Sequence, residues 1–419
     1  MADDLGDAMG APDDASADGP VDPAVNLPID PAVDLPADPA VDPPAEPDQT
    51  DTPLPAPAVT QTVRAKSQPD AGSSKPKATS HLLARYLALR AVLIIPTVWI
   101  LVTVVFFLLR VIGDPITAAL GGRLPPDQLE ARKQAAGYND PIIVQYGRYI
   151  WGILHGNFGT TIDNQKISTI LLHYGPATFE LVFWALIVAF AVGIPLGRLA
   201  ARHYNKGADM AIRSFAILFY AAPVFFVALL LKLVFSIWLG WLPVSGRASP
   251  AVQTLLENNV QTNTHIYILN AIEYGDWSVI LDVLKHAVLP ALALGLLTAG
   301  VFIRLIRINL LQTLRADFVT SARARGVAEG KVVSQHAFRN ALIPIVTVMG
   351  MEIAMMLGGA ILTETSFEWQ GLGYWIAQYL TRRDFVAVQG IVTFFALVVA
   401  CVSFLIDLIN ALVDPRVRY

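Results

Sequence analysis

The chain has 419 residues, of which 54% are hydrophobic and only 15% are charged, and its mean hydropathy is +0.51. A soluble globular domain rarely combines so apolar a composition with so few charges, so the composition excludes an ordinary soluble protein. The formal net charge of −4 conceals an uneven distribution. The first 51 residues contain fourteen of the 34 acidic side chains and no Lys or Arg, so the remainder is basic. The single cysteine, Cys401, excludes an intramolecular disulfide.

Residues 1–80 have the composition of a disordered tail. The tetrapeptide Asp-Pro-Ala-Val recurs at Asp22, Asp30 and Asp38 in a background rich in Pro, Ala and Asp. Such a segment buries too little apolar surface to offset the entropy lost on ordering. No positive segment precedes a short apolar core, so a secretory signal is not predicted. We interpret residues 1–80 as a disordered acidic cytoplasmic spacer; the alternative is a regulatory or partner-binding tail.

The rest of the chain, residues 81–419, alternates between apolar and polar segments. Six apolar segments are long enough to cross a bilayer core of roughly 30 Å. They lie at about 90–111, 178–200, 212–239, 286–307, 341–363 and 386–412. The predicted fold class is therefore all-α: a polytopic membrane protein with six transmembrane helices. A long polar loop, 113–176, separates the first two spans and includes a predicted short helix near 125–136.

Basic residues are distributed unevenly between the connecting segments. The segments before span one, between spans two and three, between spans four and five, and after span six are basic, whereas the intervening segments are neutral or acidic. Because Lys and Arg concentrate in short cytoplasmic loops, this pattern places both termini in the cytoplasm. Loop 113–176 is then extracytoplasmic, and loop 310–340 is cytoplasmic.

Loop 310–340 has the features of a docking element for a soluble partner. Seven Lys or Arg side chains lie between Arg304 and Arg339, against only Asp317 and Glu329. A stretch of good helix formers carries Arg323 and is ended by a glycine at position 326. The pattern predicts a helix, a glycine turn and a second helix.

The same loop carries a family resemblance. Its stretch DFVTSARARGV, followed by HAFRNALIP, resembles the cytoplasmic coupling loop of ABC-importer permeases, most of all the dipeptide/oligopeptide permease family. Aligned on Gly326, Thr320 replaces the acidic residue of the general permease motif, and Phe338 and Arg339 replace its Leu-Pro pair. These departures resemble the peptide branch. DPIIVQY, GIPLGRLAA, GWLPVSGR and DPRVR also occur in family order, so the resemblance covers about 82–418.

The resemblance implies an ABC type I importer permease fold. It implies a transmembrane subunit that forms half of the pathway of an ATP-driven, binding-protein-dependent importer for di- or oligopeptides. The implied partners are a homologous second permease, two ABC ATPase subunits, an extracytoplasmic substrate-binding protein and the lipid bilayer, with no nucleic acid. ATP and Mg are expected in the ATPase subunits, and no cofactor is expected in this chain. The implied location is the inner or plasma membrane of a prokaryote.

Two sets of site residues follow from the resemblance and from charge. The residues expected to couple to the ATPases are Asp317, Ser321, Ala322, Arg323, Ala324, Arg325, Gly326, His336, Arg339 and Asn340. Charges inside spans are costly and often functional. Glu352 is the most central acid, and pathway contact and pairing with a second subunit both remain open for it. The stretch TETSFEWQGLG, 363–373, resembles a family turn, so the other candidate pathway or gate residues are Glu364, Gly371 and Gly373.

Two further charged residues lie near span ends, where structural roles are favoured. Glu180 lies close to an outer helix end, where it complements a helix N-terminus. Lys232 is expected to extend its ammonium toward the outer interface.

No catalytic or metal-binding constellation is visible in the sequence. The segment GVAEGKVV, 326–333, is one residue too short between its glycines for a phosphate loop and lacks Ser or Thr after Lys331. The seven histidines show no ligand spacing, so neither a metal site nor an enzyme is expected. The alternatives within transport are nickel chelates, glutathione or oligosaccharides as substrates. An ATP-independent channel or carrier is disfavoured because no repeated halves with broken spans are visible.

Overall fold

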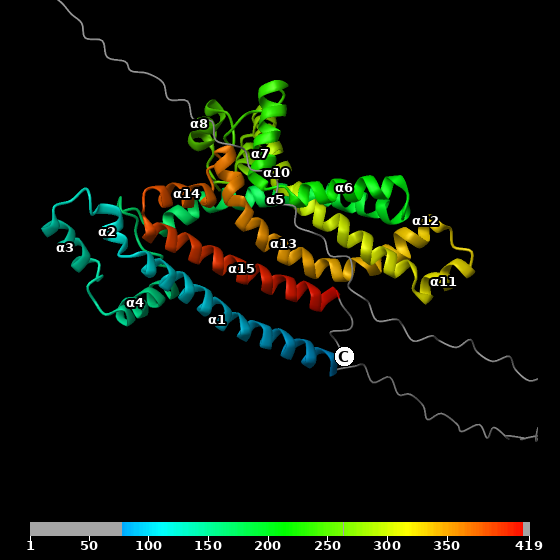
Figure 1. Ribbon diagram of the computed structural model, residues 1–419, viewed down its shortest axis with the longest axis horizontal. Helices are drawn as coiled ribbons and strands as arrows, with labels where there is room; N and C mark the ends of the chain where they lie inside the picture. The colour runs from blue at the N-terminus through cyan, green and yellow to red at the C-terminus, as the bar shows by residue number, and fades with distance from the viewer. Residues whose placement is uncertain (1–77, 263, 414–419) are drawn as a thin grey trace, which may run out of the picture. The chain divides into compact units, whose positions relative to one another are not determined.

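A computed structural model describes residues 78–262 and 264–413, and all named elements in these ranges are helices (Figure 1). Five helices contain segments long and apolar enough to cross a membrane. They are α1 (Ala78–Ile112), α5 (Ile167–Arg202), α10 (Trp277–Leu314), α13 (Phe338–Phe367) and α15 (Phe385–Val413). The predicted disordered tail lies outside the described residues except for 78–80, which already belong to α1.

The sixth candidate span is broken rather than continuous. Helix α6 (Gly207–Ala221) is followed by α7 (Val224–Leu231) and the π-helical segment η1 (Lys232–Trp238). The chain bends by 106° between α6 and the segment formed by α7 and η1. Sequence analysis expected one span over 212–239. The break follows from Pro223, which disfavours helical backbone at the residue before it, and Ala222 is extended with ψ of 135°.

The predicted loop 113–176 is largely helical. It contains α2 (Pro115–Leu120), α3 (Pro126–Ala135) and α4 (Ile142–Leu154), and α3 coincides with the helix predicted near 125–136. The loop also ends earlier than expected, because α5 begins at Ile167 and includes Pro176 within it. A proline inside a long apolar helix is tolerated when packed neighbours satisfy the freed carbonyl groups.

Helices α5 and α10 form the centre of the packing. Small residues allow their backbones to approach closely. A Cβ atom added to Gly295 would lie 2.5 Å from the Ala185 carbonyl oxygen, and one added to Gly197 would lie 2.8 Å from Ile306 Cβ. Buried side chains from α5, α10 and α13, including Leu181 and Leu294, complete this core.

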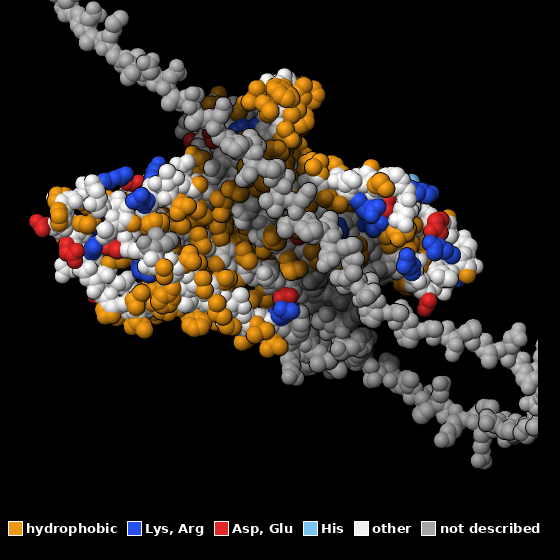
Figure 2. All heavy atoms as spheres, in the orientation of Figure 1, with side chains coloured by type: hydrophobic (Ala, Val, Ile, Leu, Met, Phe, Trp, Pro, Cys, Tyr) orange, Lys and Arg blue, Asp and Glu red, His pale blue; other side chains and the backbone are white. Residues whose placement is uncertain are grey.

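Short helices lie at two ends of the bundle (Figure 1). One end, which we call the α11 end, carries the short helices α11 (Asp317–Ala324) and α12 (Glu329–Lys331) and the π-helical segment η2 (Val332–Ala337). The opposite end, which we call the α14 end, carries α2 to α4, α8 (Pro250–Asn259), α9 (Tyr267–Tyr274) and α14 (Leu372–Thr381). Figure 2 shows hydrophobic side chains over most of the middle of one face, with charged side chains mostly near the ends. This distribution suits a protein whose middle lies in a bilayer.

A buried ion pair at the α11 end joins α6 to α10. Arg307 donates from Nε to Asp209 Oδ1 at 2.7 Å and from Nη2 to Oδ2 at 2.8 Å. The Asn205 backbone N–H adds a third bond to the same carboxylate at 3.0 Å, and the carboxylate is fully buried. Sequence analysis did not find this pair, because residues 98 positions apart give no local signal.

Arg307→Gln is expected to lower the free energy of unfolding by about 3 kcal/mol, because it leaves a buried carboxylate without its main cation. The measurement is the thermal unfolding midpoint of the purified chain in detergent. Arg213→Gln is the matched control, since Arg213 is exposed and lies 3.7 Å from the same carboxylate. Equal midpoints for the two variants would contradict a stabilising role for the Asp209–Arg307 pair.

Candidate functional site

The predicted docking loop folds as a helix, a glycine turn and a helix. Helix α11 packs through Val319 and Ala322, which are both buried against residues of α10, η2 and α13. The other predicted coupling residues lie outward: His336 is half-buried, and the exposed ones are Asp317, Ser321, Arg323, Ala324, Arg325, Gly326, Arg339 and Asn340. The loop therefore presents a mixed polar surface, while Ala322 anchors α11 to the bundle instead of facing outward.

Gly326 ends α11 in the left-handed conformation, with φ of 77°. Its N–H donates to the Arg323 carbonyl at 2.9 Å, and the Val327 N–H donates to the Ala322 carbonyl at 3.2 Å. Across this turn, Arg323 binds both oxygens of Glu329, at 3.0 and 2.7 Å. The guanidinium lowers the pKa of the Glu329 carboxyl, chiefly through these hydrogen bonds. Because both side chains are exposed, the pair adds little stability, and the glycine turn is the main constraint.

Three of the four predicted pathway residues meet at the α14 end. Glu364, in the last turns of α13, is fully buried, and its Oε2 accepts a hydrogen bond from the Tyr374 N–H at 2.9 Å. A Cβ on Gly371 would lie 2.5 Å from Glu364 Oε1, and one on Gly373 would lie 2.6 Å from Ile361 Cα. Glu364 thus caps the N-terminus of α14, and the glycines provide the space it occupies.

Glu352 does not join this cluster. It lies half-buried in the middle of α13 and makes no hydrogen bond or ion pair with the described residues. The same helix exposes Met351 and Met355 nearby. Its surroundings leave both earlier interpretations of Glu352 open.

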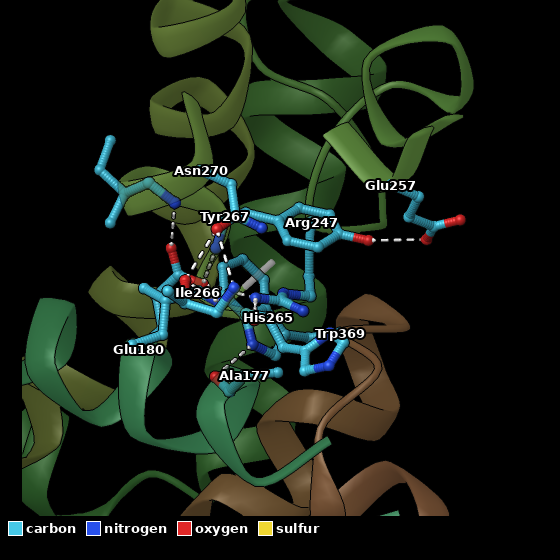
Figure 3. Close-up of polar contacts among 11 residues, drawn as sticks. Ala177, Glu180, Arg247, Glu257, His265, Ile266, Tyr267, Asn270 and Trp369 are labelled. Carbon is cyan, nitrogen blue, oxygen red and sulfur yellow. Dashed lines mark hydrogen bonds and ion pairs between the residues drawn. The ribbon is translucent and has the colours of Figure 1, made fainter. Parts of the chain in front are cut away.

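A second buried carboxylate, Glu180 of α5, caps a second short helix (Figure 3). Its Oε1 accepts from the Ile268 N–H at 3.0 Å, and its Oε2 accepts from the Tyr267 N–H at 3.2 Å, at the start of α9. The same Oε2 lies 2.6 Å from Arg247 Nη2, and the two side chains are only 1% and 7% exposed. The structural role expected for Glu180 fits this geometry, but the capped helix is α9 and not its own.

Arg247 contacts side chains from α5, from α9 and from the segment that follows α13. Its guanidinium lies 3.8 Å from the Tyr267 ring centroid and 5.5 Å from that of Trp369. Figure 3 shows these three side chains together. The fully buried Trp369 donates from its indole nitrogen to the Ala177 carbonyl at 2.8 Å. Burial raises the pKa of the Tyr267 phenol to about 12. We call Glu180, Arg247, Tyr267, Glu364 and Trp369 the α14-end cluster.

The sequence did not identify Arg247 as a member of the α14-end cluster. The available signal was the segment GWLPVSGR, 240–247, which the resemblance had marked. Lys232 was expected to extend its ammonium toward the outer interface. In the structure, this ammonium donates a hydrogen bond to the Ser366 carbonyl at 2.8 Å, near the C-terminus of α13. A cation is favourable at this position because of the helix dipole.

Gly373→Ala is expected to destabilise the α14 end by about 1–3 kcal/mol, because the new methyl group would overlap backbone atoms of α13 that cannot move aside cheaply. The measurement is the thermal unfolding midpoint in detergent. Gly358→Ala on α13 is the control, since a Cβ there meets open space. An unchanged midpoint for Gly373→Ala would show that α13 and α14 can move apart at this contact at little cost, which would contradict the prediction.

The geometry of the described residues defines the class of protein: an all-helical protein with several helices that are long and apolar enough to cross a membrane. Among residues 78–262 and 264–413, no group of three or more His, Cys, Asp or Glu side chains could hold a metal ion. Comparison with known families then identifies the particular kind. Residues 193–419 match the model of the binding-protein-dependent transport system inner membrane component, and 81–192 match the N-terminal model of such membrane components. The chain belongs to this family, which confirms the predicted ABC-importer permease fold.

Several relatives of this chain are named as peptide permeases. The chain is 34% identical to the di/tripeptide transport system permease protein DppB of Pseudomonas aeruginosa over 337 residues, 80% of this chain and 98% of that one. It is 35% identical to the dipeptide transport system permease protein DppB of Escherichia coli K12 over 340 residues, 80% of this chain and 99% of that one. An inward-facing structure of the MetNI methionine ABC transporter is 16% identical, covers 58% of this chain and 96% of its own, and has a TM-score of 0.42.

Proposed function

We propose that this chain is a transmembrane subunit of an ATP-driven, binding-protein-dependent importer of di- or oligopeptides. The observation that carries the proposal is the similarity to dipeptide permeases along almost their whole length. The proposed partners are a homologous second permease, two ABC ATPases and an extracytoplasmic binding protein, with ATP and Mg bound by the ATPases. The proposed location is the inner or plasma membrane of a prokaryote, with both termini in the cytoplasm.

In this proposal the exposed face of α11 contacts an ATPase subunit. The buried face of α11 packs on α10, η2 and the start of α13, so a displacement of α11 acts on helices of the bundle. Helix α13 is continuous from Phe338 to Phe367 and carries Glu364 near its far end. A movement of α13 therefore changes the contacts that cap α14. Two packings of the bundle would give alternating access: one in which the residues of the α14-end cluster are in contact, and one in which they are separated.

The test of the proposed function is uptake by cells that lack every other peptide importer. ATP-dependent accumulation of a labelled dipeptide should require this chain. Peptides should also be the ligands that co-purify with the proposed partner binding protein. A nickel chelate, glutathione or an oligosaccharide in that binding protein, with no peptide uptake, would replace the peptide proposal with one of the alternatives.

The proposed orientation predicts a labelling pattern. In a Cys401→Ala background, needed because Cys401 is exposed, single cysteines at Asn157 and Asn259 should react with an impermeant thiol reagent in intact cells. A cysteine at Gly207, at the α11 end, should react only after the membrane is permeabilised. Labelling at Gly207 alone in intact cells would reverse the proposed orientation.

A further inference from the structure

A pocket of about 180 Å³ at the α14 end carries positive charge that the proposed function does not use. It lies between α1, α4 and α15 and is lined by two arginines, Arg110 and Arg148, and by no acidic side chain. Arg148 is already paired, with its Nη2 2.6 Å from Asp140 Oδ2. Arg110 interacts with the neutral phenol of Tyr138, and no acidic side chain lines the pocket beside it.

Arg110 is held in place by aromatic rings. Its guanidinium lies 4.8 Å from the Phe106 ring centroid and 4.5 Å from that of Tyr138. It forms no ion pair with the described residues, and its Nε and Nη1 are shielded from solvent without a hydrogen-bond partner. An arginine offers five N–H donors and cannot lose its charge, so a half-buried one without a carboxylate favours an anionic ligand.

The surfaces beside the pocket are apolar. Arg110 lies at the end of the apolar segment Ala88–Val111, where Leu108 and Val111 are 61% and 87% exposed. Helix α4 also turns large apolar side chains outward, among them Ile143 and Trp151. The end of an apolar span flanked by aromatic side chains lies at the level of lipid headgroups. A small soluble anion would leave these flanking surfaces unused, whereas acyl chains would cover them.

We propose that this pocket binds the phosphate group of a phospholipid, with Arg110 as the principal donor and the acyl chains along the exposed faces of α1 and α4. The lipid would add contacts at the junction of α1, α4 and α15, where side-chain hydrogen bonds already join these helices. Thr103 and Tyr146 share one hydrogen bond of 2.6 Å between α1 and α4, and Tyr149 contacts Thr393 between α4 and α15. The phosphate would add charged hydrogen bonds at the same junction, which are stronger than neutral ones.

The first test counts the phospholipids retained by the full chain, purified in detergent with the subunits that accompany it, by native mass spectrometry. Arg110→Gln should retain phospholipid about tenfold less than the wild type, the factor expected for one lost charged hydrogen bond. Arg110→Lys should retain an intermediate amount. Arg132→Gln is the control, because Arg132 is exposed on α3 outside the pocket. Equal retention by Arg110→Gln and the wild type would overturn the proposal.

The second test uses only the wild-type protein, so it also decides the matter if Arg110→Gln fails to fold. Delipidated protein is mixed with a short-chain phosphatidic acid, with the diacylglycerol of the same chains, or with inorganic phosphate. Phosphatidic acid should raise the thermal unfolding midpoint at concentrations where the other two have no effect. An equal rise with diacylglycerol would show that the phosphate is not recognised. An equal rise with inorganic phosphate would show a small-anion site, and either result overturns the lipid proposal.

Discussion

Gly326→Val is expected to abolish ATP-driven uptake and substrate-stimulated ATP hydrolysis while membrane insertion remains normal. Position 326 has φ of 77°, a conformation that a β-branched residue adopts only at a cost of about 1–3 kcal/mol. An added Cβ meets no neighbouring atom within 4 Å, so the cost comes from the backbone alone. The eight-residue helix α11 is too short to be stable by itself, so it would shift from its place on the bundle instead of absorbing that strain.

Three variants make this prediction specific. Gly326→Asn should keep most activity, because asparagine tolerates the left-handed conformation. Gly330→Ala should also be active, since Gly330 has no positive φ and open space around its Cβ position. Arg323→Gln should have a small effect, because exposed ion pairs contribute only about 0–1 kcal/mol. The measurements are dipeptide uptake and ATPase activity of the reconstituted complex. Normal uptake by Gly326→Val would remove the basis for assigning this loop to ATPase coupling.

Arg247→Gln is expected to reduce both stability and transport, with a loss of about 3–5 kcal/mol in the free energy of unfolding. The substitution leaves the Glu180 carboxylate, whose side chain is 1% exposed, with two backbone N–H donors and no cation. It also removes the guanidinium that lies between Tyr267 and Trp369. The α14-end cluster would then lose the side chain that contacts α5, α9 and the end of α13.

The double variant Glu180→Gln with Arg247→Gln separates charge from packing. Because it leaves no unpaired buried charge, it should recover part of the stability lost in Arg247→Gln. Arg382→Gln is the control for an exposed pair, since Arg382 and Asp163 are both exposed and lie 4.0 Å apart. The measurement is the thermal unfolding midpoint of each variant at matched purity. A double variant less stable than Arg247→Gln would contradict this expectation, because it would show that the Glu180 carboxylate stabilises the start of α9 even without its cation.

Features that depend on local composition could be predicted from the sequence alone. Segments of about 20 apolar residues must form helices in a bilayer, because no water is present to satisfy their backbone groups, so the all-α class and the approximate spans followed directly. The helix and glycine turn around Gly326 also followed, since a glycine that ends a helix is a short-range signal. The break at Pro223 could not be predicted from the sequence, because another proline, Pro176, lies inside the continuous helix α5 of the same protein. Local sequence cannot tell these cases apart, since neighbouring helices decide whether the freed backbone groups are satisfied.

Only the tertiary structure decided which charged residues meet. Glu180 and Arg247 are 67 positions apart, and Asp209 and Arg307 are 98 positions apart. No periodicity connects such residues, because their pairing depends on how whole helices pack. The same packing turned Ala322 inward and brought Glu364 to the start of α14, while it left Glu352 apart. Burial makes these contacts strong, since a charge removed from water is stable only beside a partner. Composition therefore determined that this chain crosses a membrane, and the packing of its helices determined where its polar groups meet.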